Sequence, residues 1–280
     1  NNSFFTGNRK SPWLVVAYGM IGASLSGVTF MSVPGGVYSG QFTYFGIVLG
    51  YIIGYVVITF ILLPLYYKLN LTSIYSYLDI KFGRLSEKTG ALLFIISRLV
   101  GSAIRMYLVV FVLYEFVFKT WGIPFWVPAL LFILLILVYT FKGGIKTVVW
   151  TDTLQTTFLL SAAIITVVII LNRLDITFGE LMTISSERGL TKLFETDWSH
   201  SKFIVKQILS GAFITITMTG LDQDMMQKNL TCKTLKEAQK NMISYGAMFL
   251  PINFIFLLLG FLLILLGQKE QIPIPFGDEL

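Results

Sequence analysis

The chain has 280 residues, of which 55% are hydrophobic and 13% charged, and a soluble domain carries roughly 25% charged residues. Apolar runs recur along the whole length, and they are too continuous for the alternating strands of a membrane barrel. This composition excludes a soluble domain and predicts an all-α, polytopic bundle of transmembrane helices. The net charge of +6 does not indicate a nucleic-acid partner, because basic residues of membrane proteins collect in cytoplasmic loops.

The apolar runs predict about seven membrane spans, each near the roughly 20 residues that a bilayer requires. The expected spans are 12–35, 42–66, 89–118, 124–141, 147–172, 203–225 and 240–267. After the sixth span, "TCKTLKEAQK" is expected to form an amphipathic helix on the membrane surface. The single cysteine, Cys232, excludes an intramolecular disulfide. The N-terminal segment does not resemble a signal peptide, and we expect it to lie within a longer chain.

The first span is interrupted by small and polar residues, "GASLSGVTFMSVPGG". Two interpretations of its hydroxyl residues, Ser24, Ser26 and Thr29, remain open. They can serve close helix packing, with each hydroxyl bonded to the preceding turn. Alternatively, they line a binding site beside an unwound segment whose free carbonyls bind a hard cation such as Na⁺.

The distribution of Lys and Arg predicts which side of the membrane each loop faces. If residue 1 lies in the cytoplasm, the loops on that side hold twelve basic residues and those on the other side hold seven. Most of the seven fall in or beside the long polar stretch 172–202, which counts for little in the positive-inside rule. A cytoplasmic start is therefore expected.

Three charged residues, Arg98, Arg105 and Asp152, are expected inside spans. Intramembrane charges are rare and favour a functional hypothesis, such as a substrate or ion path. The alternative is structural pairing, either among themselves or with Asp222 or Asp224. No Walker motif is present, since "KGGIKT" lacks its spacing, so the sequence gives no support to an ATP-driven pump.

The stretch "YTFKGGIKTVVWTDTLQ" resembles the signature of the sodium/solute symporter family, which includes bacterial proline, sugar and sialic acid transporters. "GASLSGVTFMSVPG" is similar to the first core helix of that family, and "GLDQDMMQKNLTCKTLKEAQKN" to its sixth core helix and following loop. The resemblance implies a leucine-transporter-like fold of two inverted five-helix repeats. Residues 12–172 would form the first repeat, and 203–267 the first two helices of the second. The chain would then be a truncated form of the fold, ending before core helix eight.

The resemblance also implies the site residues. The carbonyls of Gly22 and Leu25, with Ser26 beside them, would bind the coupling Na⁺, and Asp152 would attract Na⁺ along the cytoplasmic path. Ser24, Ser26 and Thr29 correspond to the hydroxyls that line the sialic acid site. Arg105 corresponds to the arginine that binds the carboxylate of that substrate.

The function implied is secondary active transport and not enzyme catalysis. The chain is expected to belong to a Na⁺-coupled symporter in a bacterial inner membrane, surrounded by lipid and carrying a small solute. An anionic sugar acid such as sialic acid is favoured, because a site for a neutral solute has no need of Arg105. The alternatives are a neutral sugar or amino acid as solute, or the membrane sensor domain of a symporter-like histidine kinase.

Overall fold

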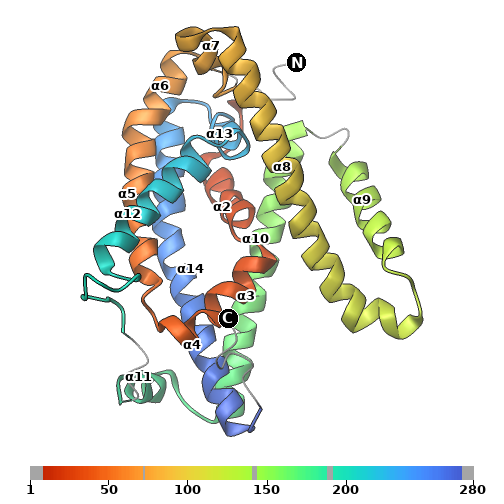
Figure 1. Cartoon of the computed structure of the whole chain (residues 1–280), viewed down its shortest axis with the longest axis vertical. Helices are drawn as coiled ribbons and strands as arrows, with labels where there is room; N and C mark the ends of the chain where they lie inside the picture. The colour runs from red at the N-terminus through yellow and green to blue at the C-terminus, as the bar shows by residue number, and fades with distance from the viewer. Residues whose placement is uncertain (1–8, 72, 141–143, 188–191, 273–280) are drawn as a thin grey trace.

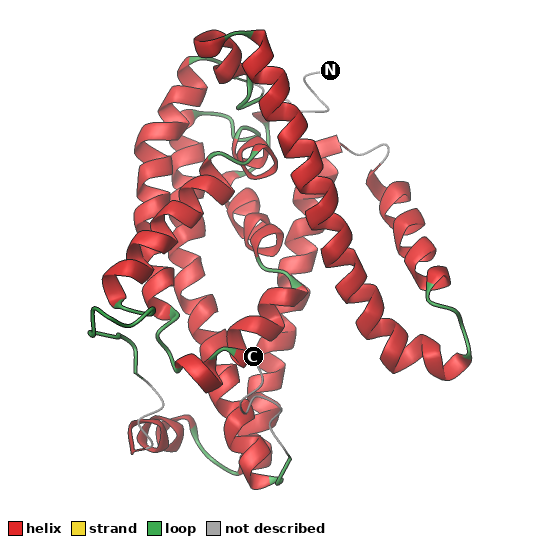
Figure 2. Ribbon diagram, viewed as in Figure 1, coloured by secondary structure: helices red, strands yellow, loops and turns green. Residues whose placement is uncertain are grey.

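Helices make up the fold, and turns connect them (Figure 2). The computed structural model describes residues 9–71, 73–140, 144–187 and 192–272. Within these ranges, the only β-type pairing is one isolated bridge between Glu195 and Phe203. The prediction of an all-α bundle is therefore confirmed.

The helices follow the chain in this order (Figure 1): α2 (Trp13–Ser24), α3 (Gly27–Gly35), α4 (Val37–Gly40), α5 (Phe45–Val57), a π turn (Ile58–Leu62), α6 (Leu63–Lys68), α7 (Ser76–Phe82), α8 (Arg84–Leu113) with short π and 3-10 turns to Trp121, α9 (Trp126–Thr140), α10 (Gly144–Leu174), α11 (Phe178–Glu187), α12 (Ile204–Thr215), a π turn (Ile216–Gly220), α13 (Gln223–Asn229) and α14 (Leu235–Lys269).

Each predicted span corresponds to an apolar helix or to a bent pair of helices. In the part of the chain that the structure describes, four helices are long and apolar enough to cross a membrane, namely Phe45–Lys68, Arg84–Trp121, Thr147–Leu174 and Leu235–Lys269. Two further spans are bent pairs: α2 with α3 and α4, at 66°, and α12 with α13, at 72°. The remaining apolar segment, Trp126–Val138 in α9, is shorter. Among the described residues, the first and sixth predicted spans are therefore the broken ones.

The helix α14 lies at the centre of the bundle, and 67% of its apolar window is buried. It contacts α2 and α3 of the first broken span, α13 of the second, and the long helices α5 and α10, and it joins these elements into one core (Figure 1). By contrast, only 6% of the apolar window in α8 is buried. Figure 1 shows α8 and α9 to one side of the other helices.

Close packing of α5 against α12 depends on glycines. A Cβ on Gly50 would lie 2.2 Å from the Ile208 carbonyl oxygen, and a Cβ on Gly211 would lie 2.1 Å from that of Ile47. No larger residue fits at either position. The backbones of the two helices therefore lie close together, as small residues allow where membrane helices pack. This contact fixes the start of the sixth span beside the second.

The prediction of a surface helix over "TCKTLKEAQK" is wrong. The segment from Leu235 onward is the first part of α14, which continues without a break into the apolar run. Thr234 caps this helix by accepting a hydrogen bond from the Glu237 backbone N–H, 3.2 Å away. Ala238 and Met242 are fully buried, so this turn packs inside the protein. No helix-breaking residue separates the polar first turns from the apolar ones, and the helix continues.

Candidate functional site

The first span is interrupted over two residues. The helix α2 ends at Ser24, and Leu25 and Ser26 adopt extended backbone before α3 begins at Gly27. Ser26 and Thr29 form a capping box: the Ser26 hydroxyl accepts from the Thr29 backbone N–H at 3.4 Å, and the Thr29 hydroxyl accepts from the Ser26 N–H at 3.3 Å. Two orphan donors of α3 are thereby satisfied, which stabilises a new helix start directly after the break.

The backbone carbonyls near the break differ in whether they accept a hydrogen bond. Among the described residues, no donor is hydrogen-bonded to the carbonyl of Leu25. The carbonyl of Gly22 instead lies within α2 and accepts a hydrogen bond from the Gln155 side chain at 2.7 Å. The interruption is therefore confined to Leu25 and Ser26, a small part of the stretch of small and polar residues.

The sixth span is interrupted at Leu221 and Asp222, between the π turn that ends α12 and the start of α13. Asp222 caps α13, because its carboxylate accepts from the Met225 backbone N–H at 3.1 Å. The same carboxylate forms an ion pair with Arg98 from α8. Pairing of Arg98 with Asp222 was one of the structural alternatives considered from the sequence, and the structure contains this pair.

A central cavity of about 420 Å³ lies between the two broken spans. Hydroxyl groups are abundant in its wall: Ser24 donates to or accepts from Tyr245, and Tyr44 and Tyr51 are hydrogen-bonded to each other at 3.1 Å. The described residues that line it include Ser24, Leu25, Thr29, Tyr44, Tyr51, Tyr55, Arg98, Arg105, Thr215, Thr217, Thr219, Asp222, Asp224, Tyr245 and Asn253. A cavity of this chemistry suits a small polar solute.

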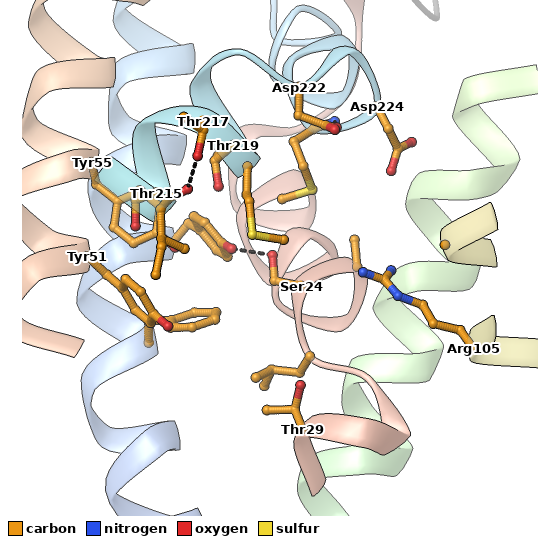
Figure 3. Close-up of a pocket in the computed structure, with 18 of the residues that line it drawn as sticks. Ser24, Thr29, Tyr51, Tyr55, Arg105, Thr215, Thr217, Thr219, Asp222 and Asp224 are labelled. Atoms are coloured by element: carbon orange, nitrogen blue, oxygen red, sulfur yellow. Dashed lines mark hydrogen bonds between the residues drawn. The ribbon is translucent and has the colours of Figure 1, made fainter. Parts of the chain in front are cut away.

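Arg105 contributes a positive charge to this wall. Figure 3 shows its side chain extending from α8 toward the break, with Ser24 and Thr29 nearby. Arg105 is exposed, and no described carboxylate lies within ion-pair distance of its guanidinium. Arg98, which lines the same cavity, is instead neutralised by Asp222. The cavity therefore has one arginine available to an external anion.

Asp152 lies outside the lining of this cavity. Its carboxylate Oδ2 is 2.7 Å from the ammonium Nζ of Lys228 on α13, and the Lys228 side chain is only 4% exposed. Asp224 lies 3.7 Å from the same ammonium. The intramembrane carboxylate thus has a buried counter-charge, which lowers the free-energy cost of placing it there.

The structure brings together four of the predicted site residues and separates the others. Ser24, Leu25, Thr29 and Arg105 line the central cavity. Ser26 caps α3, Gly22 packs against α10, and Asp152 pairs with Lys228. Three further sets of site residues were not predicted from the sequence: Lys228, the tyrosines of α5 and α14, and the threonines of "TITMTG". The threonines carry a usable signal, because three hydroxyl residues recur at every second position within an apolar span.

A helical membrane protein with two broken spans around a polar cavity has the architecture of a secondary transporter, in which unwound segments bind solutes and ions. The chain belongs to the sodium:solute symporter family, whose profile matches residues 4–273. The all-helical bundle and the transporter class expected from the sequence agree with this assignment.

Named relatives include transporters of anions. The sodium/sialic acid symporter SiaT of Proteus mirabilis is 26% identical over 99% of this chain and 55% of its own length. The human sodium/iodide cotransporter is 27% identical over 84% of this chain and 36% of its own length. A solved structure described as the substrate-bound, outward-open state of a Na⁺-coupled sialic acid symporter matches with a TM-score of 0.85 and 26% identity, over 99% of this chain and 58% of that one. The chain spans about half the length of the first of these relatives.

Proposed function

We propose that the complete protein carrying this chain is a Na⁺-coupled symporter that works by alternating access, and that its solute is an anionic, hydroxylated molecule such as a sialic acid. Family membership supports Na⁺ coupling. The sialic acid and iodide carried by the named relatives are both anions.

The choice of an anionic solute rests on the position of Arg105. Its guanidinium shares a cavity wall with Ser24 and Thr29 and has no carboxylate partner among the described residues. A guanidinium offers a planar pair of donors that matches a carboxylate. The surrounding hydroxyl groups suit the hydroxyls of a sugar acid, so one solute satisfies both features.

The coupling Na⁺ is proposed to bind at the break in the first span. The Leu25 carbonyl supports this assignment, because it has no hydrogen-bond partner among the described residues and oxygen ligands suit a hard cation. Gly22 and Ser26 are the other proposed ligands. The Gly22 carbonyl retains a lone pair beside the bond it accepts from Gln155, and the Ser26 hydroxyl would bind Na⁺ beside its two contacts with Thr29. Asp152 is proposed to attract Na⁺ from the cytoplasmic side, in competition with Lys228.

Two further proposals concern the organisation of the protein and its location. The two broken spans are proposed to open two inverted repeats, 12–172 and one that begins with 203–267, because each repeat of such transporters contributes a discontinuous helix to the site. The protein is multi-pass, and the bacterial source of the sialic acid relative supports an inner-membrane location.

Uptake by the complete protein in proteoliposomes tests the function. Radiolabelled N-acetylneuraminic acid and a neutral sugar are compared with and without an inward Na⁺ gradient. We expect Na⁺-dependent uptake of the acid. Arg105→Ala should lower the uptake efficiency for the acid by about 30-fold or more, because the solute carboxylate loses its charged hydrogen-bond partner. Arg105→Lys should lose less, since Lys retains the charge without the planar fork.

Two results would contradict the proposal in different ways. Undiminished acid uptake by Arg105→Ala would remove the carboxylate assignment and favour a neutral solute. Uptake that is independent of Na⁺ would instead remove the coupling.

A further inference from the structure

A second cavity of about 530 Å³ lies at the end of the bundle where α4 and the start of α12 meet. This end is opposite α7 (Figure 1), and the charge distribution places it on the non-cytoplasmic side. The second cavity shares two wall residues, Thr29 and Tyr44, with the central one. The two cavities therefore adjoin at these residues, and a solute that moved from the second to the first would reach Arg105.

The wall of this outer cavity has an excess of positive charge. Lys202 and Lys206 both line it, and none of the described lining residues is Asp or Glu. The Lys202 ammonium donates to the Ser39 carbonyl at 3.4 Å, and the Lys206 ammonium to the Trp198 carbonyl at 2.7 Å. Backbone carbonyls orient these ammonium groups without neutralising them. The nearby Lys192, in contrast, is paired with Glu195 at 2.6 Å.

The rest of the wall is rich in groups that bind hydroxyls. Five small hydroxyl residues line it besides Thr29, namely Ser32, Ser39, Thr43, Ser201 and Ser210. The carboxamide of Gln207, a residue that is only 7% exposed, is also in the wall. Two ammonium groups without an ion-pair partner among the described residues, set among hydroxyls and carboxamides, form a complementary surface for a polyhydroxylated carboxylate.

The position of Lys202 depends on the absence of a side chain at Gly40. A Cβ added there would lie 2.6 Å from the Lys202 ammonium nitrogen. The glycine therefore leaves the space in which the end of the lysine lies. Lys206 is positioned differently, with its ammonium 5.6 Å from the centre of the Trp198 ring, within the range of a cation–π interaction.

We propose that Lys202 and Lys206 form an outer binding subsite for a hydroxylated carboxylate, which holds the solute before it passes Thr29 and Tyr44 to reach Arg105. This proposal deepens the proposed function, since it concerns the capture of the same class of solute. The expected role is to raise the local concentration of the anion and its rate of arrival, as clefts of one sign of charge do.

The test is a binding measurement that does not require transport. The complete protein carrying Arg105→Ala is titrated in nanodiscs, with choline replacing Na⁺, and the fluorescence of Trp198 is obtained by subtracting the Trp198→Phe signal. The probes are N-acetylneuraminic acid and its uncharged methyl ester. We expect a saturable change with the acid, little change with the ester, and weaker binding of the acid as ionic strength rises.

Two variants perturb the subsite independently. Lys202→Gln removes one charge and leaves Lys206 over the reporter ring, so it should weaken binding of the acid about fivefold to tenfold. Gly40→Ala keeps both charges but displaces the Lys202 ammonium, so a smaller loss is expected. The controls are Lys119→Gln, whose lysine is paired with Glu115, and Gly35→Ala, where an added Cβ meets no atom within 4 Å. Both controls should bind as the parent does.

Equal binding of acid and ester, no fluorescence response in the parent, or unchanged affinity in Lys202→Gln would each overturn the subsite. Thermal unfolding of every variant identifies loss of fold. Where Lys202→Gln does not fold, the affinity of Gly40→Ala for the acid decides the outcome. The measurement contains neither Na⁺ nor a functional Arg105, so its outcome is separate from that of the uptake assay. The subsite can fail while symport is confirmed, and the reverse also holds.

Discussion

The ammonium of Lys228 lies 2.7 Å from the carboxylate of Asp152, and this pair joins the sixth span to the fifth inside the bundle. The Lys228 and Asp152 side chains are 4% and 14% exposed. A cation that approaches Asp152 must therefore compete with an ammonium already in contact with it. The pair connects α13, the helix that follows the break of the sixth span, to α10, which packs against α2 before the first break.

The first prediction concerns the stability that this pair provides. Asp152→Asn leaves a buried ammonium with only Asp224, 3.7 Å away, so it should destabilise the protein by about 3–5 kcal/mol. The double variant Asp152→Asn/Lys228→Met removes both charges and should recover most of that loss. Thermal or denaturant unfolding in detergent measures both. If the double variant is as unstable as the single one, the pair is not the source of the effect.

The second prediction concerns Na⁺. If Asp152 attracts Na⁺ in competition with Lys228, then Lys228→Met should lower the Na⁺ concentration needed for half-maximal uptake, and Asp152→Asn should raise it. A change of severalfold in each direction is expected, since a unit charge at about 4 Å contributes about 1 kcal/mol in water and more near a protein. Uptake at saturating solute and varied Na⁺ gives both values. Identical Na⁺ dependence in the two variants would leave the pair a purely structural role.

The third prediction concerns the contact between α2 and α10. Gly22→Ala places a Cβ 2.4 Å from the Thr156 hydroxyl oxygen and 2.8 Å from the Asp152 carbonyl. A backbone oxygen cannot move aside as the end of a side chain can, so a destabilisation of about 1–3 kcal/mol is expected. The matched control is Gly27→Ala, at the start of α3, where an added Cβ meets nothing within 4 Å.

Unfolding midpoints of the two alanine variants provide the measurement. Equal stabilities would show that α2 can move away from α10 without cost. A loss confined to Gly22→Ala would show that the first half of the broken span is fixed to α10.

The broken first span was predictable because its residues are unusual for a membrane helix. The extent of the break was not predictable, because two local interactions limit it. The Ser26–Thr29 capping box begins α3 directly after Ser26, and the Gln155 side chain donates a hydrogen bond to the Gly22 carbonyl within α2. The capping residues are visible in the sequence, whereas the contact with Gln155 spans 133 positions and depends on the tertiary packing of α2 against α10.

The role of Lys228 was not predictable from its surroundings in the sequence. It follows an apolar span and stands among polar residues, so the sequence places it in a cytoplasmic connector. The 72° bend between α12 and α13 turns this segment back toward the bundle and buries the lysine. The sequence does show the hydroxyls of Ser24 and Thr29 and the charge of Arg105. Only the fold shows that they share one cavity and that Arg98 is neutralised there by Asp222.

The last prediction concerns Cys232, the single cysteine of the chain. It lies in the turn between α13 and α14, outside the membrane-spanning segments, and it is fully buried. The Tyr67 hydroxyl donates to its carbonyl oxygen at 3.0 Å, which holds this turn against α6. Burial raises the pKa of the Cys232 thiol to about 12, and the nearby Glu237 carboxylate adds to the shift.

A raised thiol pKa means that the reactive thiolate is scarce at neutral pH. An exposed thiol has a pKa of about 8.5, so at pH 8 Cys232 should react with a maleimide about three orders of magnitude more slowly. Its rate should still increase about tenfold per pH unit up to pH 10, whereas the rate of an exposed thiol levels off above its own pKa. The exposed comparison is Lys88→Cys in a Cys232→Ser background, on the same predicted side of the membrane. Labelling of Cys232 should become fast once the protein is unfolded, and rapid labelling in the folded protein would show that the turn opens readily and that Tyr67 does not hold it closed.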